Sequence, residues 1–191
     1  MAMSLLLITT AVHGFILGGT TSYLAPYLQD DLGARITMTG IALGLLFAGG
    51  IPGQYLGGRM TDRFGRTLPV LIATVGCTGA LAVIPYVGLG MTLQATLFLL
   101  GAFMFMLQPP MTAWVSDVAH PEVKGLAFGA FFGATNAAGA LAPLLAGLLA
   151  NGAHLKLLFV VMSAVSLVSL PVVSRLQRSI EAPSRVAVHS G

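Results

Sequence analysis

The chain has 191 residues, of which nine are Lys or Arg and six are Asp or Glu. Charged residues make up 8% of the sequence and hydrophobic residues 56%, whereas a soluble domain usually carries about a quarter of its residues as charges. So few charges could not cover a water-facing surface. This excludes a soluble enzyme, a nucleic-acid-binding protein and a disordered chain.

The apolar runs between the charged residues predict six transmembrane helices, because an α-helix crosses the hydrocarbon core in about 20 apolar residues. In chain order the predicted spans are about 5–27, 37–58, 67–87, 92–115, 125–150 and 156–174. No Lys or Arg precedes Arg35, so the first run lacks the basic start of a secretory signal. We therefore expect an all-α transmembrane domain over 1–175, followed by a polar cytoplasmic tail over 176–191.

Basic residues in short loops predict the orientation of these helices. With the N-terminus inside, the inner side holds seven basic residues: Arg59, Arg63, Arg66, Lys124, Arg175, Arg178 and Arg185. The outer side holds Arg35 and Lys156. This bias predicts a multi-pass protein of the plasma (inner) membrane with both termini in the cytoplasm.

Two of the predicted helices carry glycines at every fourth position. They are Gly49, Gly53 and Gly57 in the second helix and Gly125, Gly129 and Gly133 in the fifth. This spacing places each row on one helix face, where neighbouring backbones can approach closely. Both rows lie at the cytoplasmic ends of helices that run in opposite directions, as a three-plus-three inverted repeat would produce. The alternative is that glycine is simply frequent in membrane helices.

The loop between the second and third predicted helices combines glycine, acidic and basic residues at fixed spacing: Gly58, Asp62, Arg63, Gly65 and Arg66. The order and spacing resemble the signature of the major facilitator superfamily, which often has a second basic residue at the position of Thr67. The resemblance implies one six-helix half of that fold. It also implies that this loop is a cytoplasmic latch, in which an arginine pairs with an acid at the end of the fourth helix, where Asp117 stands. The alternative is that these basic residues only set the topology.

Few polar residues fall inside the predicted spans. The resemblance places the first and fourth helices beside a central cavity, which makes His13 and Gln108 the leading candidates for contact with a substrate, with Asn136 of the fifth helix as a third. The competing interpretation is hydrogen bonding between packed helices, which is favoured for Asn136 and equally weighted for His13. No Asp or Glu lies inside any predicted span, so no carboxylate proton relay is visible.

The resemblance implies secondary transport of a small solute by alternating access. Family members usually have twelve spans in two six-helix halves, so a chain of this length would need a homodimer or a separately encoded partner half. The linker between the fourth and fifth helices and the polar tail favour equivalence to a C-terminal half. The expected partners are the solute and membrane lipid, with no nucleic acid, cofactor or metal.

Two other functions compete with transport. One is a non-transporting interaction or regulatory module of the same fold, or a transporter fragment. The other is an intramembrane enzyme, which would need a nucleophile–base pair or acidic metal ligands within the membrane, and the sequence places no such cluster there. No GxxxxGK[ST] motif occurs either, which excludes ATP-driven transport by this chain.

Overall fold

The computed structural model describes residues 2–150, 155–169 and 171, and the chain contains no strand in these ranges. The labelled elements are α1 (Ala2–Pro26), a π-helical turn (Tyr27–Asp31), α2 (Ile36–Phe64), α3 (Thr67–Val83), a 3₁₀ turn (Ile84–Tyr86), α4 (Met91–Met106), α5 (Gln108–Val118), a second 3₁₀ turn (Pro121–Val123) and α6 (Lys124–Ala150). A last helix covers Lys156–Ser169. The predicted tail over 176–191 lies outside the described residues.

Within the described residues, five helical stretches are long and apolar enough to cross a membrane: Met3–Asp31, Ile36–Phe64, Thr67–Tyr86, Met91–Val118 and Pro121–Leu144. The last helix, Lys156–Ser169, is apolar but shorter. The prediction of an all-α membrane fold is therefore confirmed.

Two predicted spans differ from the structure, one in where its helix ends and the other in being divided into two helices. The second was expected to end at 58, but α2 continues to Phe64, so most of the predicted loop motif lies on the last turns of a helix. Loss of apolarity marks where a helix leaves the hydrocarbon, and the helix itself can continue into water. The fourth span is divided into α4 and α5 at Leu107. The cause is the pair Pro109–Pro110, because proline has no N–H to donate to the preceding turn.

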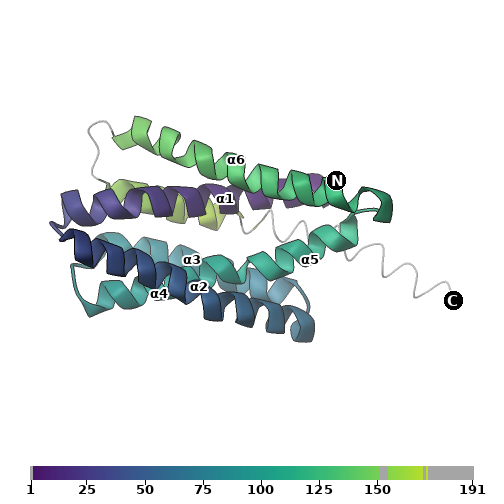
Figure 1. The fold of residues 1–191 in the computed structure, drawn as a ribbon, viewed down its shortest axis with the longest axis horizontal. Helices are drawn as coiled ribbons and strands as arrows, with labels where there is room; N and C mark the ends of the chain where they lie inside the picture. The colour runs from purple at the N-terminus through teal and green to yellow at the C-terminus, as the bar shows by residue number, and fades with distance from the viewer. Residues whose placement is uncertain (1, 151–154, 170, 172–191) are drawn as a thin grey trace.

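The helices form a bundle whose closest pairs are α2 with α4 and α1 with α6. Figure 1 shows α6 lying along α1, with α2, α3 and α4 side by side below them. Counted as spans, the first set of three is α1, α2 and α3, and the second set is α4 with α5, α6 and the last helix. An inverted repeat makes the spans of the two sets equivalent in this order, so the α2–α4 contact corresponds to the α6–α1 contact. This correspondence is the one expected for the three-plus-three inverted repeat. The start of α1, the α2–α3 turn and the α5–α6 connection all lie at one end of the bundle (Figure 1).

The first glycine row packs α2 against α4 without intervening side chains. A Cβ atom on Gly49, Gly53 or Gly57 would collide with the backbone carbonyls of Phe98, Ala102 and Met106 respectively. The contact is reciprocal, because a Cβ on Gly101 of α4 would collide with the carbonyl of Leu46. Such close approach favours helix association in membranes, where apolar side chains gain little by leaving lipid.

The second row makes no such close contact within this chain. Gly125, Gly129 and Gly133 are exposed, and no atom lies within 4 Å of a Cβ built on any of them. Instead, α6 meets α1 through the backbones of Thr135 and Gly139, against Gly14 and Gly18 of α1. Thr135 follows Gly133 by two residues, which corresponds to about 200° around a helix. The row therefore lies on the face of α6 that points away from α1.

The two rows predict opposite effects of the same substitution. Gly53→Ala should lower the free energy of unfolding by about 1–3 kcal/mol, because the added methyl forces α2 away from α4. Gly129→Ala is the matched control and should be neutral or stabilising by up to about 1 kcal/mol, since alanine favours the helix and meets nothing. The free energy of unfolding of both variants can be measured in detergent micelles. Equal losses would contradict the assignment of the two faces.

Candidate functional site

The turn between α2 and α3 is short and depends on one glycine. α2 ends at Phe64 and α3 begins at Thr67, which leaves Gly65 and Arg66 to reverse the chain. Gly65 has a φ angle of 77°, a left-handed conformation that glycine adopts without steric cost. The reversal places Arg66 at the start of α3 beside the end of α5.

Arg66 and Asp117 form a two-point ion pair across this end of the bundle. Arg66 Nη2 donates a hydrogen bond of 2.9 Å to Asp117 Oδ1, and Nη1 contacts Oδ2. This forked geometry is the arrangement in which arginine binds a carboxylate most specifically. The two side chains are 34% and 38% exposed, so water screens the pair and its net stabilisation is about 1 kcal/mol or less. An interaction of this strength can hold one conformation and still break readily.

The neighbouring motif residues do not share in this pair. The Arg63 guanidinium carbon lies 5.5 Å from the centre of the Phe64 ring, and Arg59 donates a 3.1 Å hydrogen bond to the Tyr55 hydroxyl. The sequence left Arg63 and Arg66 as candidate partners of Asp117, and in the structure the partner is Arg66. Gly58 is half-buried, and a Cβ there would make ordinary contact with the Pro109 side chain.

A recess of about 460 Å³ lies beside the ion pair, between α2, α3 and α5. Its lining combines residues of the end of α2, the turn and the start of α3 with apolar residues of α5: Thr61, Asp62, Gly65, Arg66, Thr67, Ala113 and Trp114. Asp62 is exposed at this recess, and its side-chain carboxylate forms no hydrogen bond or ion pair with any described residue. The side chain of Trp114 is buried and anchors α5 under the recess.

Asp117 is carried by a helix that is separate from α4. α5 begins at Gln108, and Pro109 and Pro110 occupy its first turn, where missing N–H groups are best tolerated. The Thr112 hydroxyl donates to the carbonyls of both Gln108 and Pro109, at 3.0 and 2.9 Å. Such bonding of a Thr hydroxyl back to the preceding turn is common inside helices, and the break between α4 and α5 follows from the two prolines.

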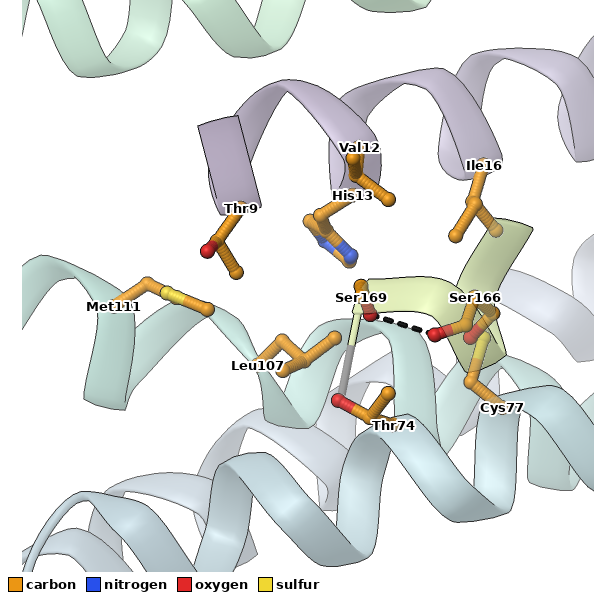
Figure 2. Close-up of a pocket in the computed structure, with 10 residues that line it drawn as sticks. All are labelled: Thr9, Val12, His13, Ile16, Thr74, Cys77, Leu107, Met111, Ser166 and Ser169. Atoms are coloured by element: carbon orange, nitrogen blue, oxygen red, sulfur yellow. Dashed lines mark hydrogen bonds between the residues drawn. The ribbon is translucent and has the colours of Figure 1, made fainter. Parts of the chain in front are cut away.

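The three residues predicted to contact a substrate are not brought together. His13 is buried inside the bundle and lines a small cavity between α1, α3, α5 and the last helix (Figure 2). Gln108 is half-buried at the start of α5 and does not line that cavity. Asn136 is exposed on α6, and its amide donates to the Phe132 carbonyl at 2.8 Å. Gln108 and Asn136 thus do not share the cavity that His13 lines.

A seam of hydroxyl groups inside the bundle was missed at the sequence level. Thr78 donates to the Ser166 hydroxyl at 2.8 Å, and Ser163 donates to the Thr78 carbonyl at 3.0 Å. These bonds join α3 to the last helix. The sequence feature that could have predicted these bonds is the spacing of three serines, Ser163, Ser166 and Ser169. Steps of three residues place them near one face of an otherwise apolar helix. In the part of the chain that the structure describes, no group of three His, Cys, Asp or Glu side chains could hold a metal ion.

The ion pair predicts an energetic coupling that is specific to Arg66. In a double-mutant cycle, Arg66→Ala and Asp117→Ala should couple by roughly 0.5–1 kcal/mol in the free energy of unfolding, since each substitution removes the same contact. Arg63→Ala with Asp117→Ala is the control cycle and should be additive, because Arg63 lies against Phe64. Coupling of equal size in both cycles would show a general charge effect in place of a defined pair.

Comparison with known proteins agrees with this architecture. The sequence profile of the Major Facilitator Superfamily matches residues 6–188. The uncharacterized MFS-type transporter YcaD of Salmonella paratyphi B (strain ATCC BAA-1250 / SPB7) is 28% identical over 161 residues, as is YcaD of Salmonella newport (strain SL254). Each match covers 83% of this chain and 41% of the relative. The chain thus spans about two fifths of the length of these curated relatives.

Solved structures show the same fold. The crystal structure of the peptide transporter POT in complex with sulfate superposes with a TM-score of 0.79 at 19% identity, over 94% of this chain and 38% of that one. A POT mutant in complex with alafosfalin gives a TM-score of 0.80 at 19% identity, over 93% and 38% of the two chains. The profile match covers nearly all of the sequence, and the helix bundle and the motif of the α2–α3 turn agree with it. The chain belongs to the major facilitator superfamily.

Proposed function

We propose that this chain is one six-helix half of a secondary transporter, which moves a small solute across the plasma membrane by alternating access. Both termini lie in the cytoplasm, and the Arg66–Asp117 pair closes a latch on that side. The observation that carries the proposal is this ion pair, which connects the α2–α3 turn to α5 beside a recess. Because this bidentate ion pair is exposed and weak, it can form in one conformation of the alternating-access cycle and break in the other.

The open helix faces support completion by a second six-helix unit. α6 is the least buried of the long helices, with 17% of its apolar window buried against 33–44% for the others. Its exposed glycines stand near its first turns, and α2 has Gly40 and Gly44 near its own start, also exposed and with nothing within 4 Å of a built Cβ. α2 and α6 are equivalent helices of the inverted repeat. Two equivalent open faces therefore flank the surface where a second half would pack.

The relatives support the same interpretation. Each YcaD transporter is long enough to contain this chain and a second unit of similar size, because the match covers 41% of its length. Exposed small residues allow close helix approach in a membrane. The second unit could be a second copy of this chain, a separately encoded half, or the rest of a longer chain of which this sequence is a fragment.

The latch predicts a change in accessibility that can be measured without knowing the solute. Ala113→Cys, made in a Cys77→Ser background because Cys77 is the chain's single cysteine, places a thiol in the recess. Adding Asp117→Asn should raise its rate of labelling by a membrane-impermeant maleimide several-fold, because the pair no longer holds α5 against the turn. Arg63→Gln is the matched control and should leave the rate unchanged. An unchanged rate with Asp117→Asn would contradict the latch.

The open face of α6 predicts an assembly that a single large side chain disrupts. In nanodiscs the chain should form pairs and should move at least one of a panel of labelled amino acids, dipeptides and sugars into proteoliposomes. Gly129→Trp should abolish pairing and flux, because it fills the open face without disturbing the α1–α6 contact. Val75→Trp is the control, since Val75 is 57% exposed on α3, and it should leave both unchanged. A strict monomer with no flux would favour a non-transporting interaction module of the same fold.

A further inference from the structure

The side chain of His13 is 9% exposed and forms no hydrogen bond with any described residue. A neutral imidazole has one N–H donor and one nitrogen acceptor. Leaving such groups unpaired inside an apolar bundle costs about 1–3 kcal/mol each. The described residues therefore leave the imidazole of His13 without a direct polar partner at this point.

Figure 2 shows the His13 ring directed into a cavity of about 20 Å³. The cavity lies between the two hydrophobic clusters of the bundle. Ile16 and Cys77 on its wall belong to one cluster, and Leu107 and Met111 belong to the other. A void of this size accommodates one water molecule and nothing much larger, since roughly 10–15 Å³ is the minimum for one water.

The hydroxyl groups around the cavity have acceptor sites to spare. Thr9 donates its proton to the Leu5 carbonyl at 2.9 Å, Thr74 donates to Val70 at 2.8 Å, and Ser169 donates to Ser166 at 2.6 Å. Each hydroxyl has a single proton and two lone pairs. These three groups can therefore offer only acceptors to a guest, while His13 offers one donor and one acceptor.

We propose that this cavity binds a single ordered water molecule, which accepts a hydrogen bond from His13 and donates to the hydroxyls of Thr74 and Ser169. Water both donates and accepts, so it can take the N–H of the imidazole and fill hydroxyl lone pairs at the same time. An apolar guest would leave the imidazole unpaired, and a solute of several heavy atoms would not fit. His13 is then a water-anchoring residue inside one half, independent of the transport proposal and distinct from any solute site between halves.

Radiolytic labelling of the full chain in nanodiscs prepared in H₂¹⁸O tests this site. X-ray pulses generate hydroxyl radicals from bound water, which oxidise the side chains next to it, and methionine sulfoxide is readily detected. Met111 lines the cavity at 2% exposure, whereas Met162 has the same exposure and does not line it. We expect Met111 to incorporate ¹⁸O several-fold faster than Met162. Equal rates would overturn the proposal.

A pair of conservative variants tests the anchoring groups without removing His13. Thr74→Val keeps the shape of the side chain and deletes a cavity acceptor, so Met111 labelling should fall towards the rate of Met162. Thr39→Val is the control, because Thr39 is also buried and also donates to the carbonyl four residues earlier. It should leave Met111 labelling unchanged. Undiminished labelling in Thr74→Val, or an equal fall in both variants, would overturn the assignment of this water to the cavity.

Discussion

Direct contact between the backbones of α2 and α4 is the constraint on which the rest of the bundle depends. Gly49, Gly53 and Gly57 bring α2 so close to α4 that any side chain at these positions would strike a carbonyl group. Because lipid solvates apolar side chains as well as the protein interior does, this close packing takes over much of the role that hydrophobic burial has in water. It also fixes the position of the α2 terminus, and hence of the turn that carries Arg66.

The break between α4 and α5 separates that rigid contact from the Arg66–Asp117 ion pair. α4 is held along the glycine row of α2, while α5 begins at Gln108 after an interruption at Leu107, with two prolines in its first turn. Asp117 lies in the last turn of α5, so it can leave Arg66 without any change in the α2–α4 packing. The same sequence thus specifies one contact that is difficult to break and another that is easy to break.

The sequence indicated some of these features and not others, for physical reasons. Runs without charge indicated the spans, because solvation of charges in lipid is costly. They could not locate the end of α2, since a helix extends beyond the hydrocarbon, and they did not reveal the division at Leu107. The motif indicated that an arginine meets Asp117, but whether this is Arg63 or Arg66 depends on the turn at Gly65.

The candidate site was harder to predict because residue spacing defines a helix face without saying what that face meets. α6 has small residues on every side, so the row at Gly125, Gly129 and Gly133 could not be distinguished from the true contact at Thr135 and Gly139. His13 illustrates the same limit. Its place in the first helix was compatible with a cavity between halves or with the interior of one, and the structure places its side chain in the interior.

The glycine contacts also have a consequence for the polarity of the helix backbones. A built Cβ replaces one of the two α-hydrogens of glycine, so its collision with a carbonyl means that this hydrogen points at the oxygen. Gly57 in this way aims a Cα–H group at the carbonyl of Met106, a weak hydrogen bond that is common between membrane helices. That carbonyl is the one to which Pro110 cannot donate an N–H. The Cα–H group of Gly57 in α2 therefore compensates, in part, for the N–H group that Pro110 of α5 lacks.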